Sequence, residues 1–164
     1  MEDIMSRLKN WFMQQEWKVI INPDKSVKLS SAFTKRYSTM DAEYFTFLKS
    51  FQRVISNDER TWFLCANEYN EISDLAFKWN EFELLSLEAA QGDDEWKGEI
   101  EAWWKHKLPI IMSVKNGYSF YAIDLDSETS AIIKGEEPEF EEAEIVAKDF
   151  YEFLNMLMSS KIEI

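Results

Sequence analysis

The chain has 164 residues, and its 31 acidic residues against 18 Lys and Arg give it a net charge of −13 at pH 7. This is the length of one ordinary domain, and 7 Trp, 12 Phe and 6 Tyr beside only 4 Gly and 3 Pro favour a compact fold that is mostly helical or combines helices with a sheet. The acidic balance argues against nucleic acid and anionic membrane surfaces as partners, because both are bound through clustered Lys and Arg.

The first third of the chain predicts two helices and a short strand. Apolar residues at helical spacing predict a helix over residues 3–18. Alternating apolar and polar residues predict a strand over residues 27–29. A second helix is predicted to begin after Ser38 or Thr39 and to end at Asn57, with one apolar face formed by Tyr44, Phe47, Leu48, Phe51 and Ile55.

The middle of the chain predicts a strand followed by two helices. Residues 61–65 are rich in residues that favour β-structure. Apolar positions over residues 72–87 predict a helix, although two overlapping apolar sets make this the least regular pattern in the chain. The turn-forming residues 92–94 then interrupt the pattern, and a tryptophan-rich helix is predicted over residues 95–107.

A meander of three strands is predicted next. The apolar runs 108–114 and 118–125 are separated by Asn116 and Gly117, and this dipeptide between two apolar runs is the strongest short-range signal for a β-hairpin. A shorter strand is predicted over residues 131–134.

A last helix is predicted to begin at Asp149, because Asp149 with Glu152 three residues later is a capping-box arrangement. Strands and helices occur in runs and do not strictly alternate along the chain. This order predicts the α+β class, as a single domain over residues 1–164 with one mainly antiparallel sheet flanked by helices.

The expected compartment is the cytoplasm. Cys65 is the only cysteine, so no disulfide can form within the chain, and the apolar run around Cys65 predicts a buried thiol. The first residues have no basic segment followed by an apolar one, and no run of about 18 apolar residues occurs. We therefore expect neither a secretory signal nor a membrane span.

No motif of catalysis or metal binding is found. His106, the only histidine, has no nucleophile or orienting group nearby in the sequence, and with Cys65 it cannot make a zinc site. Residues 124–128 are similar to the opening of a calcium loop, but Thr129 and Gly135 replace the required Gly and Glu, which favours a polar turn. The sequence predicts no catalytic residue, no metal and no cofactor.

The most concentrated charge is the acidic stretch of residues 136–144, which is either a solvated loop or a docking surface for a basic partner. Phe140 lies within it and is either an anchor for that partner or a link to the core. The candidate partner-binding residues are Glu136, Glu137, Glu139, Phe140, Glu141 and Glu142. Trp103 and Trp104 are adjacent, so one of them must lie towards the flank of its helix, at the core edge or in an interface.

The last third of the chain resembles the SUKH superfamily. The resemblance is carried by Leu-Pro-Ile-Ile at 108–111, by the aromatic strand after Asn116-Gly117, by Ala-Ile-Ile at 131–133 and by the helix that follows Asp149. Residues 41–48 are similar to an early helix of this family. The chain differs in having Asp149 where the family has Ser, and in lacking Asn-Gly-Gly after the early helix.

This resemblance implies a sheet flanked by helices and a bacterial immunity protein that binds and neutralises a toxin, often a nuclease. A second role found in the family is that of an intracellular regulatory scaffold in cell-wall synthesis or signalling. An enzyme without a recognisable motif is the third hypothesis; it would require a pocket with convergent polar groups. The net charge of −13 agrees with a basic protein partner.

Overall fold

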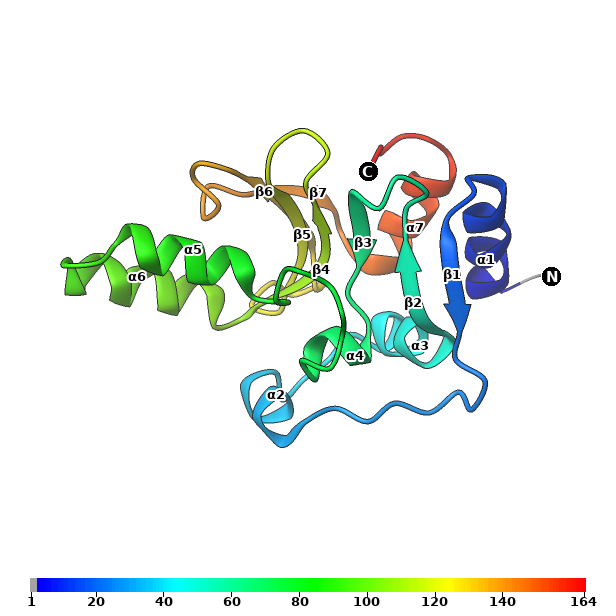
Figure 1. Ribbon diagram of the computed structural model, residues 1–164, viewed down its shortest axis with the longest axis horizontal. Helices are drawn as coiled ribbons and strands as arrows, with labels where there is room; N and C mark the ends of the chain where they lie inside the picture. The colour runs from blue at the N-terminus through cyan, green and yellow to red at the C-terminus, as the bar shows by residue number, and fades with distance from the viewer. Residues whose placement is uncertain (1–2) are drawn as a thin grey trace.

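The computed structural model describes residues 3–164, which contain seven helices and one seven-stranded antiparallel sheet (Figure 1). The α+β class predicted from the sequence is therefore confirmed. The strands are β1 (Lys18–Ile21), β2 (Phe51–Ile55), β3 (Thr61–Phe63), β4 (Lys107–Ser113), β5 (Ser119–Asp124), β6 (Ile132–Glu136) and β7 (Glu144–Ala147). The helices are α1 (Ile4–Gln14), α2 (Ser31–Arg36), α3 (Ala42–Ser50), α4 (Ala66–Tyr69), α5 (Glu81–Ala89), α6 (Asp94–Trp104) and α7 (Phe150–Met158).

The strands lie side by side in the order in which they occur in the chain. Two of the connections contain helices: α2 and α3 lie between β1 and β2, and α4 to α6 lie between β3 and β4. The predicted hairpin is confirmed, since Ser113 of β4 pairs with Ser119 of β5 around a turn at Gly117. Gly117 has a φ of +82°, a conformation that a residue with a Cβ atom adopts only with strain.

Both faces of the sheet are buried. On one face, Phe63 packs edge-on against Phe12 of α1 and contacts Phe47 of α3, and α1, α3 and α7 contact one another there. On the other face, Phe120 packs against Trp104 of α6. Burial on both sides explains why the central strands are apolar at nearly every position and do not alternate.

The α5–α6 hairpin extends beyond the edge of the sheet (Figure 1). Its base is held by Arg36 of α2, whose guanidinium lies 2.6 Å from a carboxylate oxygen of Glu83 and donates to the backbone oxygen of Trp104 at 3.1 Å. Because Glu83 belongs to α5 and Trp104 belongs to α6, Arg36 joins α2 to both helices of the hairpin. The Glu83 side chain is buried. A carboxylate buried in this way requires its partner, because an unpaired buried charge is strongly destabilising.

Aspartate residues define the beginning of four helices. In each case the side chain of the residue before the helix accepts a hydrogen bond from a backbone N–H in its first turn, which stabilises the helix start. These residues are Asp3, Asp41, Asp93 and Asp149. Asp149 was predicted for this role, whereas the second helix is capped by Asp41 and not by Ser38 or Thr39.

The predicted helix ending at Asn57 is wrong in its second half. Helix α3 ends at Ser50, and the residues that follow form strand β2 between β1 and β3. Phe51, Val54 and Ile55 are apolar at spacings that fit either structure. Backbone pairing on both sides, together with the β-branched Val54 and Ile55, favours the strand.

Three further differences concern short or irregular segments. The first helix ends at Gln14, because Glu16 has a φ of +60° that reverses the chain into β1. Residues 27–29 pair with no strand in the described chain, and their apolar side chains only pack against the core. Residues 72–80 are irregular, so the predicted helix there begins only at α5. Strands β1 and β7 and helices α2 and α4 had no prediction.

Candidate functional site

The acidic stretch is the connection between β6 and β7, and it lies against the α5–α6 hairpin (Figure 1). Of the five candidate glutamates, four are exposed to solvent: Glu136 at the end of β6, and Glu137, Glu139 and Glu142 in the connection. The exposed acidic residues of the neighbouring hairpin are Glu88, Asp93, Asp94, Glu95, Glu99 and Glu101. The loop and the hairpin together therefore form an acidic end of the molecule.

Phe140 holds this loop to the core. Its side chain is only 5% exposed, and its ring stacks on Phe82 of α5 with the centroids 4.7 Å apart. Gly135 of β6 allows Phe120 and the backbone of Phe140 to approach closely, because a Cβ atom at this position would lie 2.5 Å from both the Phe120 ring and the Phe140 carbonyl oxygen. Of the two roles considered for Phe140, the structure assigns the link to the core.

Glu141 differs from the other glutamates because its carboxylate points into the protein. Its Oε2 accepts hydrogen bonds from Trp104 Nε1 at 2.9 Å and from Ser86 Oγ at 2.8 Å. Trp104 is 1% exposed, so its N–H requires a partner within the protein. Glu141 therefore fixes the loop to α5 and α6 at once, and this leaves the four exposed glutamates at a defined position.

A depression of about 380 Å³ lies between the loop and the hairpin. It is lined by Leu85, Ser86, Ala89, Trp96, Pro138, Glu139, Phe140, Glu141 and Glu142. Trp96 is 45% exposed, whereas Trp104 on the same helix is buried and Trp103 is half-buried. The depression thus combines apolar walls, one exposed indole and an acidic border, and we call it the acidic depression.

Two carboxylates of this border are held close together. The backbone N–H of Glu142 donates to the Glu139 carbonyl oxygen at 3.0 Å, which places both residues in one tight turn. Hydrogen bonding to the Glu139 side chain and the negative charge of that side chain raise the pKa of Glu142. The negative charges of Glu139 and Glu142 repel each other, and a cation placed beside the two carboxylates would reduce this repulsion.

The exposed position of Trp96 was not predicted from the sequence. Trp96, Ile100 and Trp104 are four residues apart, so helical periodicity places them on one buried stripe. Trp96 is nevertheless exposed because the first turn of α6 lies at the part of the hairpin that extends beyond the sheet (Figure 1). No signal in the sequence gives the length of this extension.

Other groups with shifted pKa values are found in the interior. The hydroxyl groups of Tyr44 and Tyr69 are 2.6 Å apart, and they donate to the backbone oxygens of Leu64 and Pro109, each at 2.6 Å. Burial raises the pKa of both tyrosines and of Cys65. The two tyrosines complete hydrogen bonds inside the fold, and the predicted burial of Cys65 is confirmed.

The remaining sequence candidates lie apart from the acidic depression. His106 lies in the turn between α6 and β4, and its backbone oxygen accepts from Leu125 N at 2.9 Å. The carboxylates of Asp124 and Asp126 lie 3.2 and 3.7 Å from the Lys107 ammonium group. These residues therefore belong to a polar turn in which a lysine pairs with the carboxylates. Within residues 3–164 no group of three or more His, Cys, Asp or Glu is arranged to hold a metal.

The longest described helices, α1 and α6, have 11 residues each, and none of the described helices could cross a bilayer.

No family model matches the sequence, and comparison with curated proteins also gives no match. The acidic depression is therefore the feature of this protein that points to a function.

Proposed function

We propose that this chain is a non-enzymatic protein-binding domain of the immunity type, which acts in the cytoplasm and neutralises a basic toxin domain such as a nuclease. The observation that carries the proposal is the acidic depression, in which the exposed Trp96 is bordered by Glu139 and Glu142. Tryptophan is a preferred anchor residue of protein interfaces. The resemblance to the SUKH superfamily supports the immunity role.

A basic partner fits this site for two physical reasons. An Arg or Lys side chain placed between Glu139 and Glu142 would compensate their mutual repulsion. The same side chain could contact the face of the Trp96 indole, which attracts cations. The acidic residues of the hairpin would in addition accelerate the encounter with a basic protein, and this acceleration would decrease with salt.

The rigid attachment of the loop agrees with inhibition by binding alone. Phe140 and Glu141 hold the loop in place before any partner arrives, so little ordering is needed on binding. Among the groups with raised pKa values, Tyr44 and Tyr69 are buried and hydrogen-bonded within the fold, and the Cys65 thiol is buried. This placement supports a binding role over an enzymatic one.

The regulatory scaffold is the alternative within the same fold. It would use the same surface for a partner that is not a toxin. A toxin gene beside the gene for this chain, and survival of cells that express both proteins, would favour the immunity role. Capture of a kinase or a wall-synthesis enzyme by the tagged chain would favour the scaffold.

The first test is to identify the partner by affinity capture from native lysate with washes at low and high salt, and then to measure binding kinetics with charge variants. We expect that replacing Glu136, Glu137, Glu139 and Glu142 by Gln slows association at least about tenfold at low salt and flattens its salt dependence. Trp96→Ala is expected to increase the dissociation rate roughly tenfold or more, because an interface anchor is lost.

The matched control removes the same charge from other surfaces, by replacing Glu16, Glu71, Glu128 and Glu163, which are exposed, with Gln. This control should retain most of the association rate of the natural chain. If both quadruple variants slow association equally, the net charge and not the acidic depression steers the partner. Unchanged kinetics in the first quadruple variant and in Trp96→Ala would place the interface elsewhere.

A further inference from the structure

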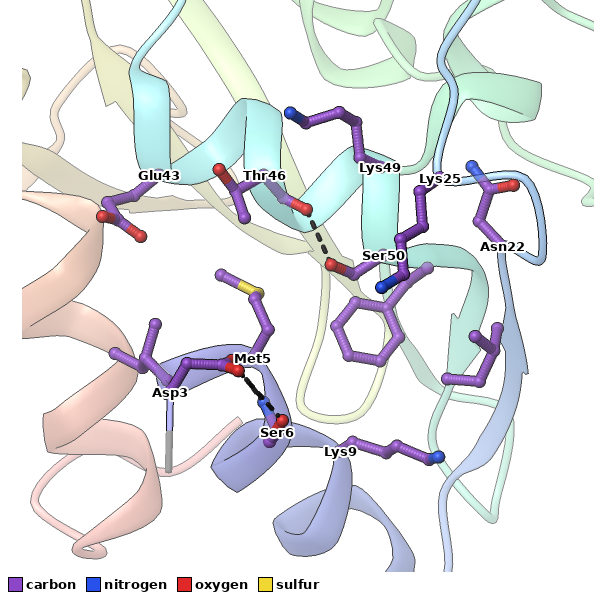
Figure 2. Close-up of a pocket in the computed structure, with 13 residues that line it drawn as sticks. Asp3, Met5, Ser6, Lys9, Asn22, Lys25, Glu43, Thr46, Lys49 and Ser50 are labelled. Atoms are coloured by element: carbon purple, nitrogen blue, oxygen red, sulfur yellow. Dashed lines mark hydrogen bonds between the residues drawn. The ribbon is translucent and has the colours of Figure 1, made fainter. Parts of the chain in front are cut away.

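A second and larger hollow lies at the opposite end of the molecule from the acidic depression, between α1, α3 and the turn that follows β1 (Figures 1 and 2). Its volume of about 630 Å³ is within the range of small-molecule sites. Ile4, Met5 and Phe51 contribute a floor of largely buried apolar side chains. The polar side chains of Ser6, Asn22, Thr46 and Ser50 form its walls. We call it the lysine cavity.

Two lysines from different elements border this cavity. Lys9 belongs to α1, and Lys25 belongs to the turn after β1, where its φ of +49° fixes the course of the backbone. Both side chains are exposed, and among residues 3–164 neither ammonium group has an ion-pair partner. Two positive charges without an ion-pair partner thus lie beside an apolar floor.

The charges of the cavity are separated in space. Figure 2 shows Asp3 and Glu43 on one side and Lys9 and Lys25 on the other. Asp3 accepts hydrogen bonds from the backbone N–H and the hydroxyl of Ser6, and the former hydrogen bond above all lowers its pKa, so this side stays negative. An anion is therefore repelled from one side of the cavity and attracted to the other.

The hydroxyl groups of the walls already donate within the protein. Ser50 donates to the Thr46 carbonyl oxygen at 2.8 Å, and Thr46 donates to the Ala42 carbonyl oxygen at 3.0 Å. Binding of an anion would therefore depend on the ammonium groups of Lys9 and Lys25. Ammonium groups act as point charges and suit phosphate, whereas the planar carboxylate is matched better by arginine.

From this arrangement we propose that the lysine cavity binds a small organic phosphate, with the phosphate at Lys9 and Lys25 and an apolar body on the floor of Met5 and Phe51. The site is independent of the acidic depression and does not require the proposed immunity role. A phosphate monoester carries a charge of about −1.5 to −2 at neutral pH, so it gains more from the two lysines than a carboxylate does.

The experiment is a titration of the full chain, labelled with ¹⁵N, with phenyl phosphate, followed by amide chemical shifts in NMR spectra. We expect saturable shifts around Met5, Ser6, Thr46, Ser50 and Phe51 with a Kd on the order of 1 mM, which is typical for a ligand of this size. Inorganic phosphate, which lacks the apolar body, and phenol, which lacks the charge, should each bind at least about fivefold more weakly.

Variants test the assignment of the two lysines. In Lys9→Gln/Lys25→Gln the Kd for phenyl phosphate should increase at least about tenfold, and because both side chains are exposed the spectrum of the free protein should show an intact fold. Lys105→Gln is the control, since Lys105 is exposed, follows α6 and does not line the lysine cavity. Its Kd should stay within about twofold of that of the natural chain.

Lys49→Gln provides a second control. Lys49 borders the cavity, but its side chain runs away from it in Figure 2 and its ammonium lies 5.3 Å from the Phe45 ring centroid.

The proposal is overturned if phenyl phosphate gives no saturable shifts in the cavity, if shifts occur equally at lysines over the whole surface, or if the double variant binds as tightly as the natural chain. Equal losses in the double variant and in Lys105→Gln would also overturn it.

Discussion

Glu141 and Glu142 are adjacent in the chain, yet their side chains have different roles. Glu141 accepts hydrogen bonds from Trp104 and Ser86, whereas Glu142 is exposed beside Glu139. A pattern of glutamates in the sequence does not distinguish the two. The difference matters for any test of the acidic depression, because a variant of Glu141 changes the position of the loop as well as its charge.

We expect Glu141→Ala to lower the free energy of unfolding by about 1–3 kcal/mol, because it leaves the buried Trp104 N–H and the Ser86 hydroxyl without an acceptor. Glu141→Gln retains a carbonyl oxygen as acceptor and should lose less. Urea denaturation measures both. Glu142→Gln is the control and should not lower stability, because it only removes a charge that repels Glu139; a loss as large as that of Glu141→Ala would contradict the structural role of Glu141.

Glu68 gives stability a dependence on pH. Burial raises its pKa, and the hydrogen bond that its Oε1 accepts from Cys65 N at 2.9 Å opposes this only in part. The folded protein therefore retains this proton to a higher pH than the unfolded chain does. The stabilisation linked to Glu68 is complete below its ordinary pKa of 4.5 and is lost as the pH rises through the raised value.

Glu68→Gln stays uncharged, so its free energy of unfolding relative to that of the natural chain is expected to rise between pH 4.5 and pH 7. Urea denaturation of both proteins at these two pH values measures the change. Glu71→Gln, at an exposed position, should show no such trend. A stability difference for Glu68→Gln that is independent of pH would show that Glu68 has the same pKa in the folded and unfolded chains.

At the scale of elements, α7 shows how a local signal survives in the fold. Asp149 Oδ1 accepts from Glu152 N at 2.7 Å, and Glu152 Oε2 in turn accepts from Lys148 N, also at 2.7 Å. The reciprocal bond thus reaches one residue further back than in the usual capping box. Such contacts involve residues close in sequence, which is why the start of α7 could be predicted.

Asp149→Ala removes this cap and is expected to lower the free energy of unfolding by about 1 kcal/mol. Asp149→Ser retains an acceptor oxygen and should differ from the natural chain by only a few tenths of a kcal/mol. Urea denaturation again provides the measurement. Equal losses in both variants would mean that the negative charge at the helix start, and not the hydrogen bond, is what stabilises α7.

Strand β2 and the irregular segment before α5 show where local signals fail. Residues 51–55 have apolar spacings that suit a helix as well as a strand, and only the neighbours β1 and β3 decide between them. In residues 72–80, Phe77 packs against Trp62 of β3 and Trp79 packs against Tyr69 of α4, so these apolar residues do not mark one helix face. In both cases contacts distant in sequence override the local preference.

At the scale of the whole molecule, the charge is distributed unevenly. The acidic loop and the α5–α6 hairpin lie at one end, and the lysine cavity lies at the other (Figure 1). A net charge of −13 gives only the excess of acidic residues. Its distribution depends on which segments the sheet brings together, so an acidic protein can still offer a local site for an anion.

The sequence by itself determined the α+β class, the β4–β5 hairpin, the start of α7 and the burial of Cys65. It also identified the acidic stretch as a candidate site. Each of these follows from residues that are near one another in the chain, where turn geometry, capping and periodicity act directly.

Only the tertiary structure decided that Phe140 and Glu141 hold the acidic loop, that Trp96 is exposed and that Lys9 and Lys25 border one cavity. These properties depend on segments far apart in the chain, such as α6 and the β6–β7 loop. Their contacts are set by the pairing of the sheet and by how far the hairpin extends beyond it. No local pattern of residues encodes those two quantities, because they result from packing of the whole domain.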